Sequence, residues 1–471
     1  MKFALLPLAI TLVSSTFAQN TIYWTDPVVI EESEDGQRPR ISLLDDNSPV
    51  LMYSTYLLSG KNLYFSKWEN NDFAQPVQMN DANLLTYDWG GAEIDTDGEN
   101  VYVVFKEENV TTGRVYIRHS DDGGLTWGIK NQIEDAGGEL AMYPAVKAYD
   151  GNRVMVTYMT HGTGGVNPQY IVKTSVDSAQ TFSSATQVSA GYGDEACYCC
   201  PAAFAANDDY QVLAFRNDDN NIRDIKAAVS TDHGTSFPDY VSLDDHDWYL
   251  TACPSTGPEI ELVNATLYAT YMNKGEGDEM VYFVQDDLSD ATPYEEKQVI
   301  ATDSVDNVNH PALANIGDTV VVVWQQAENG ETNLWYNFSF NGISDWDEAN
   351  AAPVLDIANS QNYCDLAIGT DGSLHLVYRD EYENRVMYTR GYFSALSIDN
   401  NTAQNFEVYP NPANNEVVLK GITETSKVTV STLTGELVLK MTGNQLNVQE
   451  LPAGVYLIEV EGFETKRLIV E

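Results

Sequence analysis

The chain has 471 residues, of which 43% are hydrophobic and 11% aromatic, enough for a large folded protein with more than one domain. Its 70 acidic residues outnumber its 25 basic residues, which gives a formal net charge of −45 at pH 7. A surface this negative repels nucleic acid and anionic membranes, so neither is an expected partner.

The first eighteen residues have the pattern of a secretory signal peptide. Lys2 precedes an apolar run from Phe3 to Val13, and small residues lead to a cleavage site after Ala18. The apolar run is too short for a membrane span, and no other run in the sequence reaches the necessary length. We therefore expect residues 1–18 to be removed during export and the mature protein to lack a membrane span.

Seven similar units follow between Arg38 and Tyr378. Each unit has a small or turn residue, a short apolar strand, a turn and a second strand that ends in an aromatic residue. A unit of this length cannot bury its own apolar face, so neighbouring units must stack radially. This predicts an all-β, seven-bladed β-propeller over residues 19–395, with four strands in each blade around a central channel. The units are 39–53, 91–105, 144–158, 201–215, 258–271, 311–324 and 364–378.

The seventh unit lacks a fourth strand, because its third strand, residues 385–392, leads directly into the C-terminal segment. The stretch from Trp24 to Ile30 has the pattern of the missing strand. We expect this stretch to pair with the seventh blade and to remove the open edge of its sheet.

Three of the predicted hairpins share a motif, in residues 120–127, 175–182 and 230–237. They resemble the Asp-box repeat, S-x-D-x-G-x-T-W, of sialidase-like propellers. The resemblance implies that the serine and aspartate side chains hold the tight hairpin together, so that Asp122, Asp177 and Asp232 are structural. It also implies that the ligand site lies on the face opposite to these hairpins.

The C-terminal segment, residues 396–471, alternates apolar residues with Gly, Pro and Asn turns, which predicts a small β-sandwich. It contains Tyr-Pro-Asn-Pro at 409–412 and Pro-Ala-Gly-Val-Tyr at 452–456. These motifs resemble the type A C-terminal sorting domain of the type IX secretion system of Bacteroidetes. The resemblance implies export through the periplasm by that secretion machinery, with release or attachment at the cell surface.

The repeat register predicts which residues stand at the mouth of the channel. Seven residues stand immediately before the first strands of the seven units: Arg38, Gly90, Tyr143, Cys200, Gly257, His310 and Tyr363. The loops between second and third strands lie at the same end and contain His161, Arg216, Arg223 and Arg379. An arginine side chain is a planar fork that suits a carboxylate or a sulfate. We expect Arg38, Arg216, Arg223 and Arg379 to bind an anionic substrate. Alternatively, Arg216 and Arg379 pair with Asp218, Asp224 or Asp380 beside them.

The remaining mouth residues suggest a reaction on an acidic glycan. We expect an elimination reaction, by a lyase or a dehydratase, with His310 or His161 as the base and Tyr143 or Tyr363 as the acid. The expected substrate is an oligosaccharide or polysaccharide that contains uronate, with or without sulfate groups. One alternative is a sialidase-like exo-glycoside hydrolase with Tyr363 as nucleophile and Asp88 as acid. Another is a lectin-like propeller that binds a glycan without turnover.

Four of the five cysteines flank the fourth and fifth units. Export favours disulfides, and a bridge from Cys253 to Cys197 or Cys199 is expected. A soft metal bound by Cys199, Cys200 and Cys253, with His310 as a further ligand, is the alternative. A structural calcium ion at residues 218–221 is a further candidate.

Overall fold

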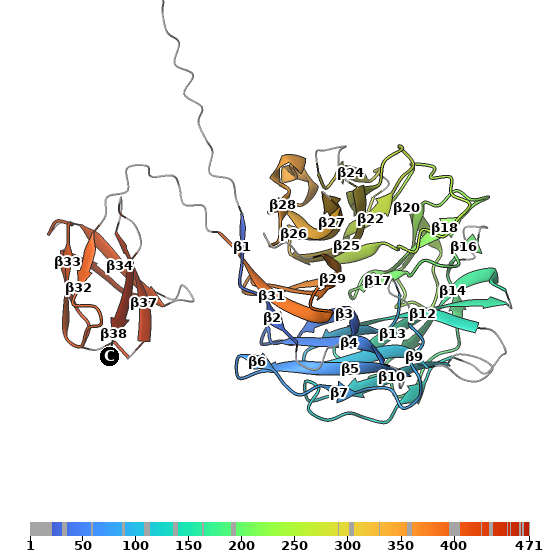
Figure 1. Cartoon of the computed structure of the whole chain (residues 1–471), viewed down its shortest axis with the longest axis horizontal. Coiled ribbons are helices and arrows are strands. Elements are labelled where there is room, and N and C mark those ends of the chain that lie inside the picture. The colour runs from blue at the N-terminus through green and yellow to red at the C-terminus, as the bar shows by residue number, and fades with distance from the viewer. Residues whose placement is uncertain are drawn as a thin grey trace, which may run out of the picture. The chain divides into compact units, whose positions relative to one another are not determined.

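The computed structural model is all-β, as the sequence predicts, and divides into two compact units (Figure 1). One unit spans Ile22–Phe393 and the other contains Ser394–Glu471. The structure describes residues 21–470, except for residues 31–34, 58–59, 87–89, 108–113, 135–139, 163, 190–194, 291, 301–305, 329, 356–359, 395–405, 425, 433–436, 450, 453, 461–462 and 464–465. The predicted signal peptide and Asp88 lie outside the described residues.

The described residues of the larger unit form seven antiparallel sheets of four or five strands. The first sheet contains β3 (Gly36–Leu43), β4 (Pro49–Leu57), β5 (Gly60–Glu69), β6 (Asp72–Phe73) and β7 (Val77–Gln78). The second contains β8 (Glu93–Asp97), β9 (Asn100–Glu107), β10 (Arg114–Ser120) and β11 (Asn131–Gln132), and the third contains β12 (Leu140–Tyr149), β13 (Arg153–Gly162), β14 (Val166–Ser175) and β15 (Thr186–Gln187). The fourth contains β16 (Glu195–Ala196), β17 (Ala203–Ala206), β18 (Gln211–Asp218), β19 (Ile225–Ser230) and β20 (Asp239–Ser242).

The last three sheets follow the same order. The fifth contains β21 (Glu259–Val263), β22 (Thr266–Asn273), β23 (Met280–Asp287) and β24 (Glu295–Gln298). The sixth contains β25 (Asp306–Ile316), β26 (Thr319–Glu328), β27 (Glu331–Ser339) and β28 (Ala352–Pro353), and two short 3-10 helices, η2 (Gly342–Asp345) and η3 (Glu348–Asn350), lie between β27 and β28. The seventh contains β29 (Gln361–Ile368), β30 (Leu374–Asp380) and β31 (Arg385–Phe393), joined by β1 (Ile22–Trp24) and β2 (Val28–Val29).

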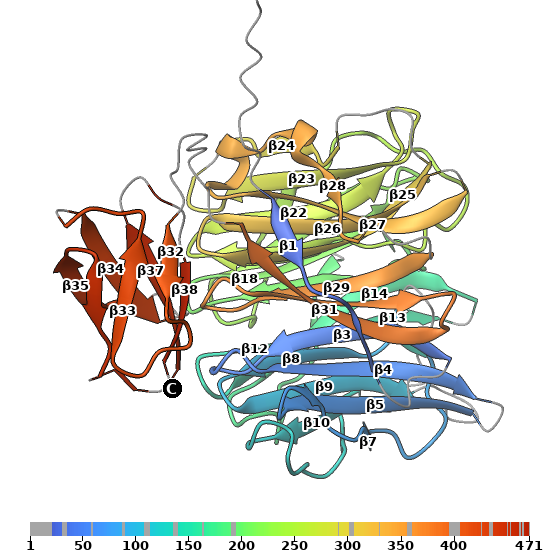
Figure 2. The ribbon, with the colours of Figure 1, turned by 60° about the vertical axis from the view of Figure 1, so that its left-hand side comes forward.

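The N-terminal strand completes the seventh sheet, and this prediction is confirmed. Ile22 pairs with Phe393 and Trp24 with Gly391, in an antiparallel register between β1 and β31. Further along, β2 pairs with the same strand. Figure 2 shows β1 alongside β31, although the two strands come from opposite ends of the unit's sequence. This pairing covers the edge of β31 that would otherwise be open.

We call β3, β8, β12, β17, β21, β25 and β29 the first strands of the seven sheets. They surround a central cavity of about 330 Å³. Contacts between neighbouring first strands run from β3 through β8, β12, β17, β21 and β25 to β29, and β29 returns to β3. Each of these strands contributes residues to the cavity wall. The cavity is therefore shared by all seven sheets.

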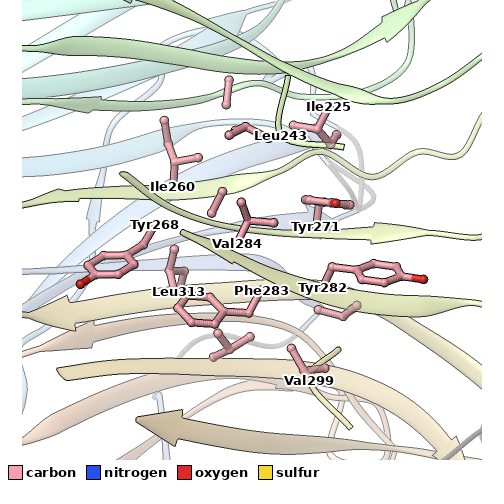
Figure 3. Packing of buried hydrophobic residues seen from close by; sticks show 14 of the residues in the cluster. Ile225, Leu243, Ile260, Tyr268, Tyr271, Tyr282, Phe283, Val284, Val299 and Leu313 are labelled. Carbon is pink, nitrogen blue, oxygen red and sulfur yellow. The ribbon is translucent and has the colours of Figure 1, made fainter. Parts of the chain in front are cut away.

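Apolar side chains from adjacent sheets hold this ring together. In the largest cluster, Ile225 of the fourth sheet, Phe283 of the fifth and Leu313 of the sixth pack within one buried core (Figure 3). The side chains of Ile225 and Phe283 are inaccessible to solvent. Burying a side chain of this size contributes about 1.5–3 kcal/mol, and the packing holds the fourth, fifth and sixth sheets against one another.

The three Asp-box hairpins have the structural role that the resemblance implies. In the first, Asp122 Oδ1 accepts hydrogen bonds from Ser120 Oγ and from the Thr126 backbone N–H, each at 2.8 Å. Asp177 and Asp232 make the equivalent bonds in the other two hairpins. The Thr126 hydroxyl donates a further hydrogen bond to Asp122 Oδ2, at 2.6 Å. This bond, with those from the Thr126 N–H and Ser120 Oγ, lowers the pKa of Asp122 to about 2, so its carboxylate is committed to the hairpin.

The hairpins lie at the opposite end of the sheets from the predicted mouth. Ser120 pairs with Val101 near the start of β9, and Asp97 at the end of β8 pairs with Asn100, the first residue of β9. The Asp box therefore lies where β8 ends, whereas Gly90 precedes the start of β8.

The smaller unit contains two sheets that share one hydrophobic core. The three-stranded sheet has β32 (Glu407–Tyr409), β33 (Glu416–Lys420) and β36 (Gln445–Asn447). The four-stranded sheet has β34 (Lys427–Thr432), β35 (Leu437–Thr442), β37 (Gly454–Val460) and β38 (Lys466–Val470). Val417 of the first sheet and Ile458 of the second lie in the same buried cluster.

Candidate functional site

Four of the predicted mouth residues share an unusual backbone conformation. The φ angles of Arg38, Tyr143, His310 and Tyr363 are 43°, 48°, 46° and 48°, in the left-handed region that favours glycine. Each residue lies at a shift in strand register, where a bulge interrupts the pairing of the first strand with the second. Such strain costs about 1–3 kcal/mol per residue and is common where a side chain is aimed at a functional site.

The structure brings three of these residues together. A small cavity at the mouth is lined by Arg38, His310 and Tyr363, together with Arg40 and Glu259. The rings of His310 and Tyr363 have their centroids 4.9 Å apart. Tyr143 is buried, and a Cβ added to Gly90 would lie 2.4 Å from its ring, so Tyr143 packs over Gly90 at the rim.

The centre of the site is Arg40, one layer below the mouth. Its Nε lies 2.9 Å from Glu93 Oε2, its Nη2 lies 3.4 Å from Glu259 Oε1, and its Nη1 lies 3.5 Å from Asp365 Oδ1. Arg38 forms a further ion pair with Glu93. We call these five residues the arginine–carboxylate cluster. They come from the first, second, fifth and seventh sheets.

Two carboxyl groups of this cluster, Glu259 and Asp365, have raised pKa values. Burial raises the pKa of Glu259 to about 7, and the negative charges of Asp365 and Glu93 act in the same direction, while Arg40 opposes them. Burial also raises the pKa of Asp365. The Glu259 side chain still exposes 35% of its surface to the cavity. Glu259 can therefore exchange a proton near neutral pH with a group that enters the cavity.

The pKa values of the two arginines shift in opposite directions. Burial and the neighbouring charge of Arg40 lower the pKa of Arg38, with Glu93 opposing them. Burial alone would also lower the pKa of Arg40, but Glu93, Asp365 and Glu259 outweigh it and raise that pKa. The positive charge of Arg40 is thus held firmly between three carboxylates.

A second charged layer lies deeper in the cavity. Lys147 Nζ lies 3.2 Å from Asp95 Oδ1, and this charge raises the pKa of Lys147. Burial raises the pKa values of Asp95 and Glu261. Across both layers, five carboxyl groups face three cationic side chains, so the cavity wall is acidic rather than basic.

His310 is placed at the mouth as predicted, but its environment does not suit the predicted role of base. Burial and the nearby charges of Arg38 and Arg40 lower the pKa of His310 to about 3. The imidazole is therefore neutral over the physiological range, but it is a weak proton acceptor.

His161 does not fit the role of a base. Its side chain is buried, with Nδ1 2.9 Å from the Gly162 carbonyl oxygen and Nε2 3.1 Å from Met142 Sδ. Its ring packs edge-on against Tyr198. It is a packed side chain between the third and fourth sheets.

Arg216 does not fit the predicted binding of a substrate carboxylate. It is fully buried, and its guanidinium donates to the carbonyl oxygens of Thr256, Arg223 and Met272. The alternative, a pair between Arg216 and a neighbouring aspartate, is also wrong, because carbonyl groups take these positions.

The other two arginines are also held by the protein. Arg223 Nη1 lies 2.9 Å from Asp218 Oδ2. Arg379 donates to the Gly36 carbonyl oxygen and to Asn384 Oδ1, both at 2.8 Å, rather than to Asp380. Neither guanidinium is presented to a substrate, so of the four predicted arginines only Arg38 belongs to the mouth cavity.

The cysteines form one of the two predicted bridges, between Cys199 and Cys253. This bond excludes the metal site predicted at Cys199, Cys200 and Cys253, because two of its three thiolates are consumed. Cys364 is a buried thiol in a separate apolar cluster. At the predicted calcium loop, Asp218 binds Arg223 and Asp219 accepts a hydrogen bond from Asn220, so calcium binding there stays a prediction.

Sequence reasoning missed most of the arginine–carboxylate cluster, although a signal was present. Two residues after the mouth position, four of the seven units carry alanine. The other three carry Arg40, Glu259 and Asp365. These three charged positions stand out against the alanines of the other units, and all three line the central cavity.

Comparison with known families identifies the C-terminal segment. Residues 407–471 match the secretion system C-terminal sorting domain. The chain therefore carries a type IX sorting domain, which directs export to the medium or to the cell surface. Among the described residues, none of the helices has the length and apolar character to cross a bilayer.

Several solved structures match this chain at low sequence identity. The α-L-arabinofuranosidase Arb93A of Fusarium graminearum is 11% identical, with a TM-score of 0.44 over 68% of this chain and 97% of its own. The intramolecular trans-sialidase of Ruminococcus gnavus is 13% identical, with a TM-score of 0.44 over 78% and 97%. The leech intramolecular trans-sialidase is 13% identical, with a TM-score of 0.43 over 79% and 70%. A sequence search of curated proteins found no match.

Proposed function

We propose that the chain is an exported carbohydrate-active enzyme whose active site is the arginine–carboxylate cluster. In this proposal the seven sheets are the blades of a seven-bladed propeller over residues 19–395, and residues 396–471 are a sorting domain with a β-sandwich fold. The closed ring of first strands around one cavity supports the blade count. Such a cavity is where small-molecule sites are usually found.

The reaction we favour is hydrolysis of a glycosidic bond. The observation that carries it is Glu259, a carboxyl group with a pKa of about 7 that is open to the cavity and lies beside other carboxylates. Glycosidases combine one carboxyl group that holds a proton with a second that stays charged. Glu259 is the proton donor to the leaving oxygen, and Glu93, whose charge is matched by Arg38 and Arg40, is the charged partner.

The charge of the cavity favours a glycan that is neutral at the cleaved residue. Arg38 and Arg40 are already paired with carboxylates, and acidic groups outnumber basic ones along the wall. An incoming uronate would have to displace Glu93 or Glu259 from these arginines. The acidic substrate expected from the sequence therefore has little support in this geometry.

Elimination on a uronate remains the second candidate. The observation in its favour is the contact between His310 and Tyr363 at the mouth, beside Arg38. Tyr363 would serve as the acid and His310 as the base. The low pKa of His310 weighs against this reaction, because removing a carbon-bound proton needs a stronger base.

The test incubates the full-length protein with neutral, uronate-containing and sialylated oligosaccharides, and follows reducing ends and unsaturated-uronate absorbance together. The proposal expects new reducing ends without absorbance, and a loss of about 100-fold or more in kcat for Glu259→Gln. The matched control is Glu295→Gln, which makes the same change on the exposed β24. Absorbance that requires His310 would establish elimination instead. Binding without turnover in any mixture would leave a glycan-binding protein.

A further inference from the structure

The thiols Cys197 and Cys200 lie beside the disulfide between Cys199 and Cys253, and we call these four residues the cysteine cluster. The Cys197 and Cys200 sulfurs are 2.7 Å apart, and Cys197 Sγ is 3.7 Å from Cys199 Sγ. The three sulfurs of Cys197, Cys199 and Cys200 lie within 4.8 Å of one another. The remaining cysteine, Cys364, lies in a separate apolar cluster.

We propose that the cysteine cluster is a thiol–disulfide exchange centre, in which one disulfide moves between Cys199–Cys253 and Cys197–Cys200. The exchange is internal and needs no oxidant. It would break or form the covalent bond between the loop before β17 and the loop before β21, at the mouth of the cavity.

The first step transfers the bond to Cys197. The Cys197 thiolate attacks Cys199 Sγ, a Cys197–Cys199 bond forms, and the Cys199–Cys253 bond breaks. Cys253 leaves as a thiolate and takes a proton from water. Its sulfur lies 3.0 Å from Ser255 Oγ, which can donate a hydrogen bond to the leaving thiolate. Cys253 is exposed, so this thiolate is formed in contact with solvent.

The second step completes the exchange. Cys200 loses its proton to water and attacks Cys197 Sγ, which forms the Cys197–Cys200 bond and releases Cys199 as a thiolate that is then protonated. One disulfide and two thiols are present before and after, so atoms and electrons balance. The short distance between Cys197 and Cys200 favours this second bond.

The surroundings of Cys197 suit an attacking thiolate. The hydrogen bond from Cys200 lowers the pKa of Cys197, and the charges of Arg223 and Arg216 act in the same direction against its burial. By contrast, burial raises the pKa of Cys200. The sequence predicts that Arg216 and Arg223 bind a substrate carboxylate. In the structure, their positive charges instead stabilise the thiolate of Cys197.

The exchange would act on the candidate site through tightly packed loops. A Cβ added to Gly257 would lie 2.2 Å from the Pro201 carbonyl oxygen, so the loops before β17 and β21 are in direct contact. Pro201, Gly257 and Glu259 all line the mouth cavity. Loss of the Cys199–Cys253 bond removes the covalent connection beside this contact.

The test uses the full-length protein, first equilibrated with dithiothreitol until each chain holds one disulfide, and then freed of reductant. Exposed thiols are trapped over time with N-ethylmaleimide, and the trypsin peptides are quantified by mass spectrometry. Cys253 lies alone in the peptide 227–274, so its labelling reports release from Cys199. The proposal expects progressive labelling of Cys253 in the wild type, and labelling at least tenfold slower in Cys197→Ser.

Two further variants keep the result interpretable. Cys364→Ala removes a buried thiol that is not part of the cysteine cluster, and it should leave the labelling of Cys253 unchanged. Cys200→Ser should still release Cys253 but should form no Cys197–Cys200 bond. Thermal unfolding and an intact Cys199–Cys253 bond check that Cys197→Ser folds. Equal labelling of Cys253 in the wild type and in Cys197→Ser, or a disulfide that stays in one position, would overturn the proposal.

Discussion

Arg40 and Glu259 are 219 residues apart in the sequence, yet Arg40 Nη2 lies 3.4 Å from Glu259 Oε1 across the central cavity. One residue comes from the first sheet and the other from the fifth. Their contact depends on the closed ring of seven first strands, and it joins the central arginine of the site to a carboxyl group whose pKa is raised to about 7.

Glu259 should make the stability of the protein depend on pH. Its pKa is raised from 4.5 to about 7 in the folded protein, so between these values the folded state binds more protons than the unfolded state. The free energy of unfolding of the wild type should therefore fall relative to that of Glu259→Gln as the pH rises from 4.5 to 7. Urea unfolding of both proteins at several pH values measures this difference. A constant difference across that range would contradict the shifted pKa.

Replacing Arg40 should destabilise the protein strongly. Arg40→Gln leaves three carboxylates without their common cation, and loss of one partner of a buried ion pair costs about 3–5 kcal/mol. The loss should be greater at pH 8 than at pH 5, because protonation of Glu259 relieves the repulsion at the lower pH. Urea unfolding measures the loss. Arg153→Gln, which breaks a half-exposed pair with Asp150, should change the stability by less than about 1 kcal/mol.

The Asp-box carboxylate should matter for stability and not for activity. Asp122→Ala removes the acceptor for Ser120 and Thr126, and each lost hydrogen bond to a charged group costs about 1.5–3 kcal/mol. Because the pKa of Asp122 is lowered to about 2, the wild type should lose this contribution as the pH falls below about 4. Thermal unfolding tests the effect against Asp121→Ala at the exposed neighbouring position. A large loss of kcat in Asp122→Ala at a temperature where it is folded would argue against a structural role.

The N-terminal strand offers a matched pair for testing closure of the seventh sheet. Trp24 is 8% exposed and packs against Tyr336, whereas Tyr23 on the same strand is 66% exposed. Trp24→Ala should cost about 3–5 kcal/mol, and Tyr23→Ala less than about 1 kcal/mol. Chemical unfolding of the two variants measures the contrast. Equal losses would mean that the strand is not closed onto the ring as described.

Local sequence patterns determined the strands, the turns and the order of the sheets. Alternating apolar residues and turn residues at a repeat of 52 to 57 residues predict the seven units, and the Asp-box motifs predict hairpins whose hydrogen bonds lie within a few residues. The missing fourth strand of the last unit was equally predictable, because an open edge must be covered. The left-handed residues at the mouth follow the same register.

Only the tertiary structure decided what the charged residues do. The sequence could place Arg38, Arg216 and Arg379 near one face, but the partners of a guanidinium are set by which carbonyl or carboxylate groups the closed ring brings within reach. Arg216 meets three carbonyl oxygens, whereas Arg40 meets three carboxylates from other sheets. The pKa values of Glu259 and His310 depend on burial and on charges distant in the chain, so no local pattern could contain them.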